Sequence, residues 1–370
     1  MARNRVIYQS EALYVSQNAN STGKTAHEQL QRVQSANYSF NISRQDINQF
    51  GQLSRIDSIV LEAPTVSFDT TYYLGDGFNE ECLGFAKSFT IGFASGHMTA
   101  SSGKNFYIVT EAEGIDINSS DTAPNSVIGI GNAYLTDYTI DASVGSIPTV
   151  STSFEAANIN SVSTLSGTSD GISGIFSPAI SQADGSVINS QIELPNPTTG
   201  VGSITALRPG DISIAFGTAS TDAEDGPIVD IVGTADGAHI QSASLSLSMS
   251  RSPLERLGSR FPFARTVDFP VNASLSVSAI VNEVTAANLA NIIDNQNGIT
   301  VQLTFNERGT STAAASYKLV NAKLDSESFS SAIGSNKTVD LTFSTQIGGP
   351  TDVTNNILFS GASNENPFSA

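Results

Sequence analysis

The sequence predicts an all-β protein made of two tandem, duplicated β-sandwich domains, each with one short helix. Apolar residues fall at every second position over many short segments, which is the period of a half-buried strand. Two segments also repeat in the same order along the chain. The stretch VQSANYSFNISR at 33–44 returns at 240–251 as IQSASLSLSMSR, and 132–154 can be laid without a gap on 321–343.

The chain is rich in serine, so matching serines alone would not show a repeat. The apolar positions of the repeated segments match as well. In the first pair, Tyr38 and Phe40 coincide with Leu245 and Leu247, so the apolar positions stay in phase. In the second pair, eight of 23 aligned residues are identical. The offsets are 207 and 189, so the first copy carries 18 extra residues between the two blocks. Two repeated units, each as long as a whole domain, predict duplicated domains. A solenoid would need at least three units of about 20–50 residues.

The remaining strands are expected where the alternation continues between turns rich in Gly, Asp, Asn and Ser. They are 64–74, 88–93, 105–117, 211–216, 271–281, 298–305 and 338–347. A helix is expected at 285–294, where Thr285 can cap the first turn and apolar residues recur at helical spacing. A shorter helical turn is expected at 79–85.

These elements divide the chain into four parts. A first β-sandwich domain is expected at 1–165 and a second at 204–350. Between them, 166–203 is rich in Gly, Ser and Pro and poor in large apolar residues, which predicts a linker or an extended arm. The tail at 351–370 is similar but keeps several apolar residues. Docking on a neighbour and a frayed end both remain open for it.

The composition restricts the function. Of the 370 residues 35 are acidic and 17 basic, and the net charge of −18 disfavours binding to nucleic acid phosphates and anionic membranes. The single cysteine, Cys82, excludes an intramolecular disulfide and fits a reducing compartment. The N-terminal stretch lacks the pattern of a signal peptide, and no apolar run reaches the length of a membrane span.

No motif for catalysis or cofactor binding stands out, and we expect neither an enzyme nor a cofactor nor a metal. His27, His97 and His239 lack metal-site spacing and are expected on surface loops. The members of a Ser/His/Asp triad meet only in the fold, so sequence spacing does not exclude one. The acidic segments 75–81 and 221–230 lack the ligand order of a calcium loop and are interpreted as solvated turns.

The duplicated blocks resemble the closing strands of the major tail tube proteins of tailed bacteriophages. The resemblance lies in 137–159 and 324–348, each with a Ser-rich strand, a Val/Ile-Gly turn and a Thr-Val-x-x-x-Phe strand. The segments 206–216 and 254–281 also look like tail protein sequence. The presence of two copies departs from the simple family. It is similar to a minority of long-tailed phages, whose tube subunits contain two tube domains and assemble as trimers.

The resemblance implies a structural virion protein, assembled in the host cytoplasm, whose rings of three chains stack into the tail tube, the conduit for DNA ejection. The implied partners are other copies of the chain, the tail terminator, tape measure and baseplate proteins, a sheath protein if the tail contracts, and phage DNA that passes without specific binding. No membrane partner is implied. The linker and the C-terminal tail are the expected contacts between stacked rings.

Two other classes of protein remain as alternatives. One is another virion β-protein, such as a tail terminator, a baseplate hub or a capsid decoration protein. The other is a tandem β-sandwich adhesin that binds carbohydrate, although the absence of Trp weighs against it.

The alternation within the first repeat assigns its two faces. Tyr38, Phe40, Ile42, Leu245, Leu247 and Met249 are expected to point into the sandwich core. The opposite face is small, polar and uncharged in both copies, and we interpret it as a candidate lining of the tube lumen. An ordinary solvent face and a contact between neighbours remain open. The candidate residues are Ser39, Asn41, Ser43, Ser246, Ser248 and Ser250.

Overall fold

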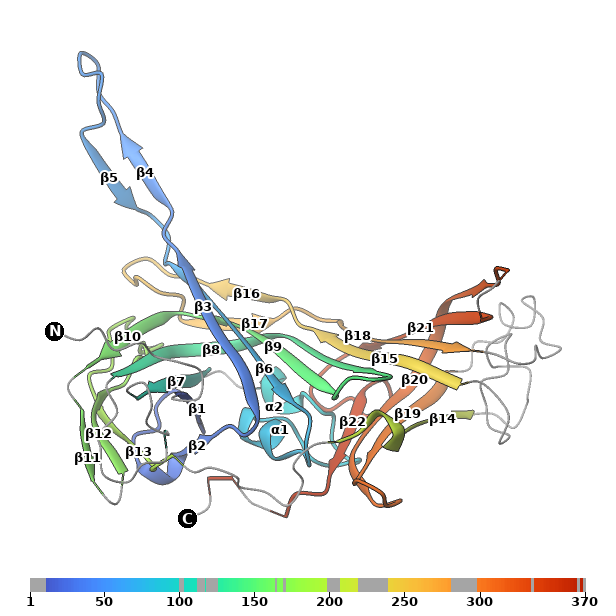
Figure 1. Cartoon of the computed structure of the whole chain (residues 1–370). Helices are drawn as coiled ribbons and strands as arrows, with labels where there is room; N and C mark the ends of the chain where they lie inside the picture. The colour runs from blue at the N-terminus through green and yellow to red at the C-terminus, as the bar shows by residue number, and fades with distance from the viewer. Residues whose placement is uncertain are drawn as a thin grey trace.

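A computed structural model of the chain is an elongated molecule in which strands predominate and helices are short (Figure 1). The structure describes residues 11–99, 103–111, 117, 126–163, 165–168, 171–197, 207–218, 239–280, 298–333, 336–364 and 367–368. The predicted all-β fold class is confirmed. The predicted helix at 285–294 lies outside the described residues.

In the first half, the alternating segments form strands, and two short helices connect β6 to β7. The elements are β1 (Glu11–Ser16), η2 (Lys24–Ala26), β2 (His27–Gln29), β3 (Val33–Asn41), β4 (Arg44–Ile47), β5 (Asp57–Val60), β6 (Thr65–Tyr73), α1 (Phe78–Leu83), α2 (Ser95–Thr99), β7 (Lys104–Thr110), β8 (Ser126–Ser143), β9 (Thr149–Ala156) and β10 (Asn158–Val162). Helix α1 fits the short helical turn expected at 79–85, whereas 88–93, expected as a strand, is a loop between the helices.

The rest of the chain continues in strands. They are β11 (Ser166–Thr168), β12 (Gly171–Phe176), β13 (Gln191–Leu194), then η3 (Pro209–Asp211), β14 (Ile212–Thr218), β15 (His239–Ser248), β16 (Arg251–Leu254), β17 (Ala264–Val267), β18 (Val271–Ile280), β19 (Ile299–Asn306), β20 (Ala313–Ser330), β21 (Thr338–Ile347) and β22 (Ile357–Gly361).

The strand order of the two halves corresponds. In the first half β3, β6, β9, β8, β7 and β1 lie side by side, and β10 adds to β8. In the second half β15, β18, β21, β20, β19 and β14 follow the same order, and β22 adds to β20. The segments 33–41 and 240–248 therefore occupy the same place in the two halves.

The residue pairing corresponds as well. Tyr38 lies opposite Phe68 and Leu245 lies opposite Leu275, so the offset of 207 applies to both strands of the ladder. The ladder irregularity between Leu135 and Asp137 in β8 has its equivalent between Leu324 and Ser326 in β20, at the offset of 189. Bulges are specific local features of a strand. Their recurrence at equivalent positions makes the correspondence a residue-by-residue one.

One backbone feature marks the midpoint of both long strands. Asn132 in β8 and Asn321 in β20 each have a positive φ of 53°, a conformation that Asn tolerates better than most residues. Gly103 and Gly298 lie against them, and a Cβ atom on either glycine would come within 2.7 Å of asparagine backbone. Before this point β8 pairs with β7 and β10, and after it with β9, so one strand serves two sheets.

A single hydrophobic core runs through both halves. Phe93, from the loop before α2, makes edge contacts with Tyr138 of β8, Tyr317 of β20 and Phe359 of β22, at centroid distances of 5.0, 5.7 and 5.4 Å. Phe85 stacks on Phe93 at 4.2 Å. Aromatic side chains bury large areas, so this cluster packs the two halves against each other.

Two predicted segments pack differently from the expectation. Within 166–203, the strands β11, β12 and β13 form a sheet, and Ile172, Ile175, Ile192 and Leu194 are buried against the first half. The four apolar residues are too few for a core of their own, but they suffice to cover a sheet that already exists. The C-terminal tail adds β22 to β20 of its own half, and its Ile357, Leu358 and Phe359 are buried.

Candidate assembly surface

The two halves are joined edge to edge by a pair of strands, which we call the internal seam. It consists of β8 residues 137–143 and β15 residues 242–248, paired antiparallel. On one face of the seam Leu245 lies opposite Ile140 and Leu247 opposite Tyr138, and all four side chains are buried. The seam makes a continuous sheet of two equivalent units, as in an assembly in which neighbouring subunits pair their strand edges.

Among the described residues, the edge of each half that is equivalent to a seam edge has no neighbouring strand, and we call it an open edge. Among the strands that the structure describes, β3, the equivalent of β15, pairs with β6 alone. The second part of β20, residues 323–330, is equivalent to the seam part of β8, and β21 is its one strand neighbour within the described residues. Unpaired edges of this kind are templates for pairing with another chain.

The prediction that Tyr38, Phe40 and Ile42 point into the core is wrong for the single chain. Their side chains are 42%, 60% and 38% exposed, whereas the equivalent Leu245, Leu247 and Met249 are buried. The alternation of the strand is as expected, but burial of β15 depends on the neighbouring first half, and the described chain provides no such neighbour for β3. On β20, Phe329 is 50% exposed where its equivalent Ile140 is buried.

The opposite face of the sheet carries the polar side chains, including the six candidate lumen residues. Ser39, Asn41, Ser43, Ser248 and Ser250 are exposed and Ser246 is half-buried. Hydroxyl groups link the strands: the Oγ atoms of Ser246 and Ser274 are 2.7 Å apart, and Ser244 donates to Asp141 across the seam at 2.6 Å. Ser250 donates to Asp268 at 2.8 Å.

Charge on this polar face is mainly acidic. The register places one group of acidic residues among its serines and threonines: Asp69, Asp137, Asp141, Glu155 and Asp340. Lys323 lies at the margin of the face, opposite Ser344 and beyond the irregularity in β20. A wall of hydroxyls and carboxylates repels phosphate and gives it little to bind.

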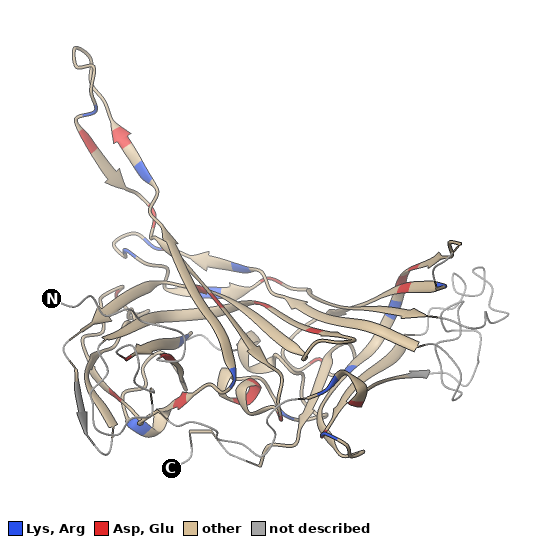
Figure 2. Ribbon diagram, viewed as in Figure 1, with Lys and Arg blue, Asp and Glu red and all other residues tan. Residues whose placement is uncertain are grey.

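Two equivalent hairpins leave the sheet. The arm, residues 42–64 with β4 and β5, projects away from the body and carries charges of both signs (Figures 1 and 2). The hairpin of β16 and β17 instead lies along the first half (Figure 1). Equivalent residues of the two hairpins differ by 207: Arg44 pairs with Val60, and Arg251 pairs with Val267. The two hairpins therefore have equal length.

Arginines attach the β16–β17 hairpin to the first half. Arg251 donates to the carbonyl groups of His97 and Leu135 at 2.9 and 3.2 Å. Arg265 forms an ion pair with Glu155 of β9. The tips of both hairpins are fully exposed: Phe50 and Leu53 on the arm, and Leu257, the equivalent of Phe50, on the β16–β17 hairpin. The first half therefore holds the strands of the β16–β17 hairpin through these arginines, whereas the arm projects away from the body (Figure 1).

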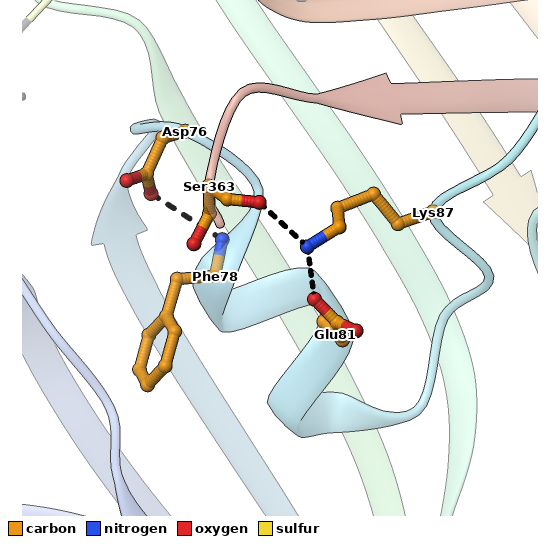
Figure 3. Close-up of polar contacts among 5 residues, drawn as sticks. All are labelled: Asp76, Phe78, Glu81, Lys87 and Ser363. Carbon is orange, nitrogen blue, oxygen red and sulfur yellow. Dashed lines mark hydrogen bonds and ion pairs between the residues drawn. The ribbon is translucent and has the colours of Figure 1, made fainter. Parts of the chain in front are cut away.

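A second set of polar contacts holds α1 against the C-terminal segment (Figure 3). Lys87 forms an ion pair with Glu81 and donates to the carbonyl of Ser363 at 2.9 Å. Ser363 in turn donates its backbone N–H to the carbonyl of Asp76 at 3.0 Å. These contacts, together with the aromatic cluster, keep the relative position of the halves fixed.

The acidic segment 75–81 is not the solvated turn that was expected. Asp76 and Glu80 are buried, and Glu80 accepts hydrogen bonds from the hydroxyls of Tyr72 and Tyr138 at 2.9 and 3.2 Å. Tyr138 is also 2.9 Å from the hydroxyl of Tyr317 in the second half. Burial raises the pKa of the Glu80 carboxyl. The segment 221–230 lies outside the described residues.

Two of the three histidines are placed differently from the expectation of surface loops. His27 and His97 are buried and His239 is exposed at the start of β15. Burial, with Lys104 and Arg251 nearby, lowers the pKa of His97 to about 3. Lys104 donates to the carbonyls of Ser16 and Gln17. Within the described ranges, no three His, Cys, Asp or Glu side chains gather as metal ligands.

The described part of the chain contains no helix with the length and apolar character required to cross a membrane. Cys82 is a buried free thiol, and burial raises its pKa.

Comparison with known proteins finds no matching protein-family model and no matching curated protein. Among solved structures, the chain is similar to a chain of the anti-feeding prophage baseplate, with 8% identity and a TM-score of 0.30, over 43% of this chain and 96% of that one. It is also similar to a chain of the SPP1 tail tube, with 13% identity and a TM-score of 0.24, over 41% of this chain and 77% of that one.

The arm and the open edge of β20 were not predicted from the sequence. A signal for the arm was present, because the offset of 207 between equivalent residues continues from the first repeat through 42–64. Extending the repeat would have predicted two hairpins of equal length. Their different positions depend on what lies beside each half, which no local pattern encodes.

Proposed function

We propose that the chain is the subunit of a bacteriophage tail tube, in which copies join through their strand edges into rings and the rings stack around a DNA conduit. The observation that carries the proposal is the internal seam. It joins two equivalent units edge to edge, and the open edges at β3 and β20 are the equivalents of the two edges that the seam closes.

The equivalence of the halves supports a common origin by duplication, and it supports rings of three chains. A seam repeated at every junction closes a ring when its rotation divides a full turn, and in this proposal it does so after six units. Six equivalent units around an axis require three chains when each chain supplies two units. The resemblance of 137–159 and 324–348 to tail tube proteins favours this number as well.

The polar face supports the role of a conduit. Ser39, Asn41, Ser43, Ser246, Ser248 and Ser250 line the lumen in this proposal, with aspartates between them. DNA can pass such a lining without binding to it, because the release of counter-ions that drives DNA binding needs basic side chains at the phosphates. No catalytic role is part of the proposal.

Contacts between stacked rings are assigned to the tip of the arm rather than to the linker and tail. Most apolar residues of 171–194 and the Ile357, Leu358 and Phe359 of β22 are buried within their own chain, although Phe176 and Val187 stay partly exposed. Phe50 and Leu53, in the loop between β4 and β5, are fully exposed, and the arm itself projects away from the body (Figure 1).

Electron microscopy of the purified protein over a range of concentrations tests the proposal. We expect hollow rings that stack into open-ended tubes. Single rings that never stack would instead favour a tail terminator. Isolated elongated particles at every concentration would overturn the proposal and leave an adhesin or a decoration protein as the alternative.

A further inference from the structure

The internal seam contains enough detail to specify the contact between two chains residue by residue. Equivalent residues differ by 207 between β3 and β15 and by 189 between β8 and β20. Applied to the seam pairs Leu245–Ile140 and Ser246–Thr139, these offsets give Tyr38–Phe329 and Ser39–Ser328. Both members of each derived pair lie on open edges.

We propose that β3 of one chain pairs antiparallel with residues 326–332 of a second copy, with Tyr38 opposite Phe329 and Ser39 opposite Ser328. The inference rests on the proposed function in that it supposes contact between copies, and it adds the partner strand and the register. Sliding the register by one residue would turn Tyr38 and Phe40 to the polar face.

Exposure and residue type identify a second copy as the occupant of both edges. Tyr38, Phe40 and Phe329 are large apolar side chains at the edge of a sheet, 42%, 60% and 50% exposed, where soluble proteins place charges. Their equivalents in the seam are apolar and buried. An aromatic pair such as Tyr38 and Phe329, directly opposite across two strands, stabilises a sheet. One position breaks this correspondence. Glu327, the equivalent of Tyr138, is charged, and it is half-buried.

The arm supplies a second contact in the same place. In the seam, Arg251 at the base of the β16–β17 hairpin donates to the Leu135 carbonyl of the neighbouring half. Arg44 is the equivalent arginine at the base of the arm, and Leu324 is the equivalent of Leu135. When the chains pair in the register of the seam, the Arg44 guanidinium lies at the Leu324 carbonyl of the second copy, and the base of the arm contacts that copy while its tip stays free for the next ring.

Cysteine pairs test the register. Directly opposite residues of an antiparallel pair lie about 4.5–5.5 Å apart at Cα, within the range of a disulfide. The variant Ser39→Cys with Ser328→Cys should form covalent dimers and trimers on mild oxidation, visible on a non-reducing gel. Wild type, whose Cys82 is buried, is the control for unintended cross-linking.

Two further variants calibrate the test. Ser246→Cys with Thr139→Cys lies at the equivalent place in the internal seam and should form a disulfide within one chain, detected by peptide mapping. Ser39→Cys with Ser326→Cys is displaced by two residues on the same face, where the partners are about 7–8 Å apart. We expect this variant to give no more than about a tenth of the cross-linked product.

The outcomes separate the register from the function. Rings seen by microscopy without a Ser39–Ser328 cross-link, or with equal cross-linking in the displaced variant, would overturn the register and leave the proposed function standing. Absence of both rings and cross-links would overturn both.

The arm contact has its own test. Arg44→Gln should weaken association of the chains by about tenfold or more, because it removes a charged donor from a carbonyl in a closed interface. Arg55→Gln is the matched control, since Arg55 pairs with Asp46 on the exposed arm itself. Equal effects of the two substitutions would overturn the Arg44 contact.

Discussion

Leu245 lies opposite Ile140 where the two halves meet, and both side chains are buried. The residues at the equivalent positions, Tyr38 and Phe329, lie on the two open edges and are exposed. This contrast between equivalent positions is the physical basis of the assembly that we propose, and each prediction below tests part of it.

Truncation at equivalent positions should have unequal effects on the single chain. Leu245→Ala leaves a cavity in a packed seam and should lower the free energy of unfolding by about 2–5 kcal/mol. Tyr38→Ala removes an exposed side chain and should lower it by about 1 kcal/mol or less, while it weakens assembly. Urea unfolding under conditions that keep the protein monomeric measures both values. Equal losses would show that Tyr38 is already packed within the chain.

The buried His97 should make the fold sensitive to mild acid. Its pKa is lowered to about 3 in the folded chain by burial, Lys104 and Arg251, while the unfolded chain keeps the ordinary value near 6.5. As the pH falls below that value, the unfolded state takes up a proton that the folded state does not. The contribution of His97 to stability is therefore lost as the pH falls.

We expect this loss to reach about 2 kcal/mol between pH 7.5 and pH 5. His97→Gln should show a smaller decrease over the same interval in denaturant titrations. Other titrating groups, Glu80 among them, are common to both proteins and cancel in the comparison. A decrease of the same size in the variant would contradict the assignment.

Removing the apolar tip of the arm should prevent the stacking of rings without affecting the fold. Phe50→Ser with Leu53→Ser changes two fully exposed side chains, so the free energy of unfolding should stay within about 0.5 kcal/mol of wild type. Microscopy should show rings and no tubes. Gln52→Ser, a polar change in the same loop, should leave the tubes intact. Normal tubes in the double variant would exclude the tip from the ring contact.

Positive charge on the polar face should slow the passage of DNA. Ser246→Lys with Ser248→Lys should leave rings assembling, and phage particles with this tube should eject DNA more slowly at low salt and recover at high salt. Ser246→Asn with Ser248→Asn adds bulk without charge and should eject normally. Failure of the lysine variant to form tubes, with no change in ejection where tubes form, would place this face at an interface instead of the lumen.

The sequence predicted most of the strands, but it predicted little of which elements pack against each strand. Period-two alternation located the strands around Tyr38 and Leu245 and the direction of their side chains, because that direction follows from strand geometry alone. It did not predict that one of these residues is buried and the other exposed, since burial depends on the partner strand. The buried Glu80 was also missed, because its tyrosine partners Tyr72 and Tyr138 come from distant strands.

The packing of 166–203 against the first half was not predicted, for a related reason. The few apolar residues of this segment, such as Ile172 and Leu194, cannot form a core alone, and that inference was sound. They are nevertheless buried, because the first half offers a sheet face for them to cover. The composition of a segment indicates whether it can form a core by itself. It gives no information on the surfaces of other segments against which it can pack.

The number of chains in the assembled ring tests the central claim most directly. Native mass measurement of purified rings, combined with symmetry analysis of their images, gives this number without reference to any residue. The account predicts three times the chain mass of 38.6 kDa, and six similar units around the axis of each ring. A ring of six chains, or a protein that stays at the mass of one chain at every concentration, would contradict it.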